Sequence, residues 1–232
     1  MTAPISESWT RIENWLAEHA PTTYGALAPP ADPADIAATE RDIGHPLPRP
    51  LVTSLLRHDG LRDQGGELLP GFYRPIGARR IADEWRRLTV YYDRRTAEEI
   101  GADEGDFDFM GRGFSSVLYG HPRLIPIARD VGGGYLVLDQ RPETDRGRVH
   151  QAEAVEGVTR GSHEVWASLP VLMETVAASL ETGRPVEHFR PEVDEQQRLR
   201  WNVIPLPDDR AVGGPGCASA LTRAPAAGRR RQ

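Results

Sequence analysis

The N-terminal part of the chain carries apolar residues at the three- and four-residue spacing of helices. A first helix is predicted to begin at Ser6, whose hydroxyl can cap it, and to end at Pro21. A second, short helix is predicted after Asp32 and Pro33, an N-cap followed by proline at the first helical position, and it stops at Gly44. The stripe on one face of the first helix is Trp9, Ile12, Leu16 and His19.

Three further segments continue this helical pattern. Residues 51–56 predict a third helix, with Gly60 as its C-terminal cap. The longest helix is expected from residue 78 to about residue 95, because one of its faces is apolar and the other carries arginines and acids. A last helix, which Ser162 could cap, is expected to reach Glu181, and Pro170 predicts a late start or a kink. The apolar positions of the longest helix are Ile81, Trp85, Leu88 and Tyr92.

Runs of β-branched and apolar residues predict strands in the second half of the chain. Residues 124–128 and 135–139 give the strongest signal, and the glycines between them predict a hairpin. Residues 147–152 are expected to add another strand. Residues 68–76 predict at most a weak edge strand, because prolines interrupt them. Alternating apolar residues within 188–207 predict an extra strand that docks on the rest.

The order of these elements predicts an α+β fold, with a single domain over residues 1–206. Residues 101–120 have no clear period and predict an irregular connection that could hold a binding loop. Residues 207–232 have the composition of a flexible, disordered tail. No apolar run approaches the roughly 20 residues of a membrane span, and the first residues lack a signal-peptide layout. We therefore expect a cytoplasmic protein.

Composition narrows the chemistry that this chain can perform. All 28 basic residues are arginines, so no lysine is available for a Schiff base, a Walker A loop or a protein-kinase site. A formal charge of −6 disfavours binding to nucleic acid and suits a basic partner. The single cysteine, Cys217, leaves no disulfide framework and no cysteine-based zinc site.

Three short motifs could carry chemistry, and each has a plainer interpretation. The acidic run at 103–108 could gather a cation, but it also suits a solvated loop. His58 and Asp59 could perform acid–base chemistry, whereas an imidazole followed by Gly60 suits a helix C-terminus. Glycines 132–134 precede a strand, which favours a hairpin turn over a phosphate loop. We expect no metal, cofactor or catalytic residue, and a small metal-dependent hydrolase is the remote alternative.

Several short motifs occur in order between residues 9 and 183. They are Trp9-x-x-Ile12-Glu13, Leu27-x-Pro29-Pro30-Ala31, Ile43-Gly44-x-Pro46-Leu47-Pro48, Leu56-x-His58-Asp59-Gly60, Ile125-Pro126-Ile127-Ala128-x-Asp130 and Leu136-x-Leu138-Asp139. In order and spacing this set resembles the Smi/Knr cell-wall-assembly regulator family of the SUKH superfamily. An aromatic residue, often tryptophan, usually precedes the Ile-Pro motif in that family, and residues 119–124 depart from this. The resemblance implies helices around a curved, mainly antiparallel sheet, and binding without catalysis.

Polar residues at the ends of elements, beside aromatic side chains, can form a concave recognition surface. For the aspartates among them, bracing a turn or a hairpin is an equal interpretation, and the tryptophan also suits the core. The expected partner-binding residues are Asp59, Trp85, Arg86, Asp130, Tyr135 and Asp139.

The resemblance leaves two binding functions open. The leading one is an immunity-type protein that neutralises a cognate toxin, because an acidic surface suits a basic toxin domain. The alternative is a cytosolic regulator or adaptor linked to cell-wall assembly. Both need a protein partner rather than nucleic acid or a membrane, and neither sets the oligomeric state.

Overall fold

The computed structural model describes five stretches of the chain, which contain both helices and antiparallel strands. The predicted loop at 101–120, the acidic run at 103–108, the tail at 207–232, Ser162 and Cys217 all lie outside the described residues. The stretches are residues 2–62, 65–93, 121–142, 146–152 and 166–204.

Six helices occur within these stretches, and five of them correspond to predicted ones. Ser6 does not cap the first: Pro4 holds the N-cap position without a side-chain hydrogen bond, and the Ser6 carbonyl accepts from Thr10 Oγ1 inside the helix. The helix that was not predicted is a short one of about one and a half turns, which begins at Pro21. The helices are α1 (Ile5–His19), α2 (Pro21–Ala26), α3 (Pro33–Ile43), α4 (Arg49–Leu55), α5 (Ala78–Asp93) and α7 (Leu169–Thr182).

Local caps mark both ends of α3 and the start of α7. Asp32 Oδ1 accepts from the Ala34 amide at 2.8 Å, and Gly44 closes α3 in the left-handed conformation, as predicted. Helix α7 starts late because Pro170 lies in its first turn, and Ser168 caps it. Gly60 is not a helix cap, since α4 ends at Leu55.

The predicted hairpin forms the centre of a four-stranded antiparallel sheet in the order β1-β2-β3-β4. The edge strand β1 is only two residues long, which is consistent with the prolines that interrupt the run at 68–76. The predicted extra strand at 188–207 is instead a separate two-stranded sheet, β5-β6. The strands are β1 (Arg74–Pro75), β2 (Leu124–Arg129), β3 (Tyr135–Asp139), β4 (Val149–Ala152), β5 (Phe189–Val193) and β6 (Leu199–Val203).

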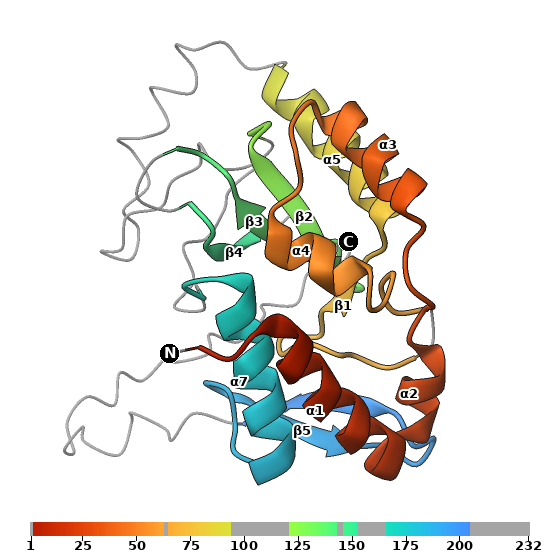
Figure 1. Cartoon of the computed structure of the whole chain (residues 1–232). Helices are drawn as coiled ribbons and strands as arrows, with labels where there is room; N and C mark the ends of the chain where they lie inside the picture. The colour runs from red at the N-terminus through yellow and green to blue at the C-terminus, as the bar shows by residue number, and fades with distance from the viewer. Residues whose placement is uncertain (1, 63–64, 94–120, 143–145, 153–165, 205–232) are drawn as a thin grey trace, which may run out of the picture.

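Both faces of the central hairpin are buried. Alternate residues of β3 divide between two clusters: Leu136 and Leu138 join the main core, while Tyr135 and Val137 pack with Leu88 of α5. In Figure 1, α3 and α5 lie side by side at one end of the molecule. Helices α1 and α7 lie side by side at the other end, next to the β5-β6 sheet. The fold is therefore α+β with antiparallel sheets, as predicted.

Candidate functional site

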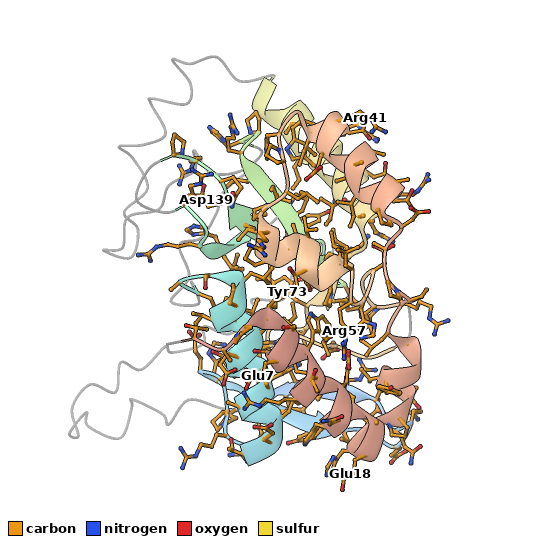
Figure 2. The ribbon with its side chains drawn as sticks, viewed as in Figure 1. Glu7, Glu18, Arg41, Arg57, Tyr73 and Asp139 are labelled. Atoms are coloured by element: carbon orange, nitrogen blue, oxygen red, sulfur yellow. The ribbon has the colours of Figure 1, made fainter. Side chains whose placement is uncertain are left out.

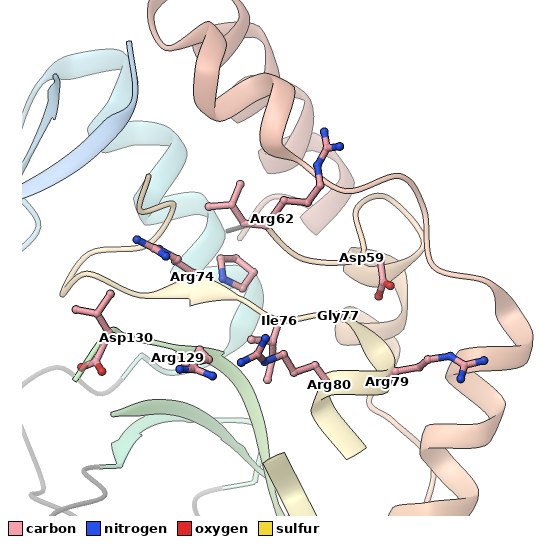
Figure 3. A pocket seen from close by; sticks show the side chains of 12 residues that line it. Asp59, Arg62, Arg74, Ile76, Gly77, Arg79, Arg80, Arg129 and Asp130 are labelled. Atoms are coloured by element: carbon pink, nitrogen blue, oxygen red, sulfur yellow. The ribbon is translucent and has the colours of Figure 1, made fainter. Parts of the chain in front are cut away.

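A cavity of about 520 Å³ opens beside the edge strand β1. Figure 3 shows side chains from β1, the N-terminal end of α5 and the end of β2 around it. Five of the lining residues are arginines and two are aspartates, which leaves an excess of three positive charges. We call this cavity the arginine pocket; its lining is Asp59, Leu61, Arg62, Arg74, Pro75, Ile76, Gly77, Arg79, Arg80, Arg129, Asp130 and Val131.

Strand pairing places two of the arginines together. Arg74 of β1 lies directly opposite Arg129 of β2 in the antiparallel ladder. Side chains at directly opposite positions project from the same face of a sheet, and like charges there repel each other. The start of α5 follows β1 closely and adds Arg80 to the same cavity.

A buried glutamate of α5 neutralises part of this charge. Glu84 Oε1 lies 3.3 Å from Arg129 Nη1 and 3.5 Å from Arg80 Nε, and its other oxygen accepts from Arg87 Nε at 2.9 Å. The hydroxyl of Tyr135 donates to that second oxygen at 2.8 Å. One carboxylate thus serves three guanidinium groups. Glu84 was not among the predicted site residues, although its spacing of four from Arg80 and three from Arg87 is visible in the sequence.

Arg74 differs from the other arginines of the pocket. Within the described part of the chain it has no ion pair, and its Nε is buried without an acceptor. By contrast, Arg79 pairs with Asp35 at 2.6 Å and lowers the pKa of that carboxyl. Arg62 donates through Nη2 to the carbonyl oxygen of Gly25 in α2.

Two of the six predicted binding residues line the arginine pocket. Asp59 Oδ1 accepts from the Ala78 amide at 2.7 Å and so caps the start of α5. Asp130 Oδ1 accepts from the Gly134 amide at 2.7 Å and braces the β2-β3 turn, which confirms that the glycine run is a hairpin turn. Both aspartates therefore have a structural role as well as a place in the pocket wall.

The other four predicted residues do not line the pocket. Trp85 is half-buried and donates through Nε1 to the Pro122 carbonyl at 2.9 Å. Arg86 is exposed on α5 and pairs with two aspartates, Asp42 and Asp83. Fully buried Tyr135 lies in the second cluster. Their assignment to a partner surface stays a prediction.

The last of these four, Asp139, is also fully buried and lies at the end of β3 (Figure 2). Arg141 donates to it from Nη2 at 2.8 Å and from its backbone amide at 2.8 Å. Within the described residues, the Asp139 carboxylate therefore forms internal contacts and is not presented at the surface.

His58, the candidate for acid–base chemistry, joins two segments of the fold. Its Nε2 lies 2.7 Å from Glu13 Oε1 of α1, and its Nδ1 lies 2.8 Å from the Ala28 carbonyl. Burial raises the pKa of Glu13, but hydrogen bonds from Arg57 and His58 outweigh this and hold it below its usual range. Figure 2 shows Arg57 beside α1. The described contacts of His58 are thus those of a structural histidine.

Among the described residues, no three His, Cys, Asp or Glu side chains gather closely enough to hold a metal ion. No helix in the described stretches is long and apolar enough to cross a membrane.

Comparison with known sequences identifies the family. Residues 30–175 match the SMI1 / KNR4 family (SUKH-1). The chain belongs to this family. As an SMI1/KNR4 protein it carries the arginine pocket entirely inside the matched region, since the pocket lining runs from Asp59 to Val131.

Two fungal proteins show the similarity in detail. The chain is 31% identical over 150 residues to "Cell wall biosynthesis/cell cycle regulator smi1" of Schizosaccharomyces pombe. The aligned region covers 60% of this chain and 29% of that protein. It is 25% identical over 187 residues to "KNR4/SMI1 homolog" of Yarrowia lipolytica, with coverage of 60% and 25%. This SMI1/KNR4 chain therefore spans less than a third of the length of either relative.

Proposed function

We propose that this chain is a non-catalytic binding domain of a cytosolic regulator linked to cell-wall assembly. The observation that carries the proposal is the family match over residues 30–175, together with a similar fission-yeast protein whose name describes a cell-wall and cell-cycle regulator. The arginine pocket supports a binding role, because arginine is enriched where proteins recognise partners.

This proposal reverses the order of the two functions favoured by the sequence. The toxin-neutralising function came first there because a net charge of −6 suits a basic toxin. The similar fission-yeast protein carries a regulator name, and the arginine pocket has the opposite sign to the whole chain. Both observations favour the regulator.

The test is an affinity purification of the tagged full chain from cells that express it, followed by mass spectrometry with quantification. We expect several sub-stoichiometric partners that take part in cell-wall synthesis or its signalling. The tag alone, expressed at the same level, is the control. Recovery of one stoichiometric, basic, toxin-like partner would overturn the regulator and restore the immunity function.

A further inference from the structure

The arginine pocket has positive charge that the described part of the protein does not neutralise. Arg74 and Arg129 occupy directly opposite positions in the β1-β2 ladder, and Arg80 shares Glu84 with Arg129 and Arg87. Placing like charges directly opposite each other destabilises a sheet unless an anion lies between or beside them. The arrangement is therefore one that an external anion would stabilise.

Arg74 gives this anion a specific docking point. Its Nε is buried and has no acceptor within the described residues, although guanidinium groups are ordinarily hydrogen-bonded when buried. Arginine presents a planar fork of donors that matches the two oxygens of a carboxylate. A carboxylate in the pocket would pair with the terminal guanidinium nitrogens of Arg74, which has no ion pair among the described residues.

The rest of the lining indicates what surrounds the anionic group. Leu61, Pro75, Ile76 and Val131 give the pocket apolar wall, and its volume of about 520 Å³ exceeds what one carboxylate fills. The arginines come from separate elements and are interrupted by Asp59 and Asp130, so the positive charge is spread along the cavity. Several singly charged groups on one segment match this spread better than one doubly charged group does.

We infer that the arginine pocket binds an acidic segment of a partner protein, in which aspartate or glutamate carboxylates contact Arg74, Arg80 and Arg129 and an apolar side chain contacts Ile76. This inference rests on the proposed binding function and names the chemistry of the partner. Arg62, which donates to the neutral Gly25 carbonyl, keeps its charge and adds to the positive potential of the pocket, whereas Arg79 is paired with Asp35.

The experiment measures fluorescence anisotropy of a short labelled peptide that alternates glutamate and aspartate with leucine, titrated with the full chain. Arg74→Gln is the decisive variant, because it removes a charge without removing any described hydrogen bond. We expect it to weaken peptide binding about tenfold or more while leaving the melting temperature unchanged or raised. Arg129→Gln should weaken binding as well.

The matched control is Arg190→Gln, which removes an arginine exposed on β5 and outside the pocket. It should bind the peptide as the unaltered protein does. A peptide in which every acid is replaced by its amide should not bind, and added salt should weaken binding of the acidic peptide.

Three results would overturn the inference. They are absence of binding by the acidic peptide, an equal loss in Arg74→Gln and Arg190→Gln, and binding only when the peptide carries a phosphorylated serine. The same variants in the affinity purification separate this inference from the proposed function. If Arg74→Gln recovers the same cell-wall partners as the unaltered chain, the pocket assignment fails and the regulator proposal stands.

Discussion

At the residue scale, close packing of the backbone explains why the motif Leu56-x-His58-Asp59-Gly60 ends in glycine. Gly60 has a φ of +86°, and a Cβ at this position would lie 2.8 Å from the Gly77 amide nitrogen and 2.9 Å from the Pro75 carbonyl oxygen. The segment after α4 therefore passes against the edge strand at a distance that only glycine allows. The two amide-to-carbonyl bonds nearby, from Leu61 to Pro75 and from Ala28 to Gly60, fix this crossing.

Gly60→Ala is therefore expected to destabilise the protein. Both the positive φ and the clash with backbone atoms contribute, and we expect a loss of about 2 kcal/mol or more in the free energy of unfolding. Urea unfolding followed by circular dichroism measures it. Gly25→Ala in helix α2 is the control, because no atom lies within 4 Å of its added Cβ; it should be neutral or stabilising. Equal effects of the two changes would contradict this account.

Asp139 is a motif residue whose buried carboxylate pairs with Arg141 within the protein. Asp139→Asn keeps the shape of the side chain but removes the negative charge that pairs with the Arg141 guanidinium. Breaking a buried ion pair in this way is expected to cost about 3 kcal/mol of stability. Chemical denaturation of the variant checks this value. Asp83→Asn, which breaks an exposed pair with Arg86, should change stability by less than about 1 kcal/mol.

At the element scale, one aspartate organises the turn of the β5-β6 sheet. Asp194 Oδ1 accepts from the amides of Gln196 and Arg198, both at 2.9 Å, and Oδ2 accepts from the guanidinium groups of Arg198 and Arg200. Burial raises the pKa of Asp194, but these hydrogen bonds outweigh it and lower that pKa to about 2. The turn is thus held by the charged form of one side chain.

The stability supplied by Asp194 should depend on pH in a definite direction. When folding lowers the pKa of a carboxyl, that carboxyl stabilises the folded protein fully at pH values above its ordinary pKa. This contribution is lost as the pH falls toward the folded-state pKa of about 2. Asp194→Asn should therefore be less stable than the unaltered protein by about 1–2 kcal/mol near neutral pH. Urea unfolding at a series of pH values should show the gap narrowing with acid. A gap that stays constant would contradict the assignment.

Elements with local signals were predictable, and those that depend on distant contacts were not. Helix α3 carries its own start and stop in Asp32 and Gly44, and the β2-β3 hairpin carries its own glycines. No local sequence signal shows that β5-β6 is a separate sheet. Its position depends on the packing of Leu199 and Trp201 in the main core, which involves residues distant in sequence. The helix α2 is short, and its stability comes from contacts such as Thr23 Oγ1 with the Gly65 carbonyl.

At the scale of the whole molecule, the arginine pocket has the opposite sign to the net charge of the chain. The sequence sums to −6, yet pairing of β1 with β2 and the close start of α5 bring Arg74, Arg129 and Arg80 into one pocket. Asp59 and Asp130 were recognised because they sit in ordered motifs, whereas the arginines lie far apart in sequence and only the fold joins them. Charge at a binding site is a property of topology more than of composition.

Glu84 couples the core to this pocket, and its replacement should change stability and binding in opposite directions. Glu84→Gln removes the acceptor charge for Arg80, Arg87 and Arg129, so we expect a loss of about 2–3 kcal/mol in unfolding free energy. The same change frees positive charge at the pocket, so the acidic peptide should bind more tightly. Urea unfolding and anisotropy on one preparation measure both effects.

The control for this last change is Glu7→Gln, which removes an exposed charge in the first turn of α1; it should cost less than about 1 kcal/mol of stability and leave the peptide affinity unchanged. A less stable Glu84→Gln protein with unchanged peptide affinity would mean that the glutamate supports the fold alone. A gain in affinity that disappears when Arg129→Gln is added would instead show that Glu84 competes with the acidic segment for the same guanidinium group. That competition is what the shared oxygen of Glu84 between Arg80 and Arg129 predicts.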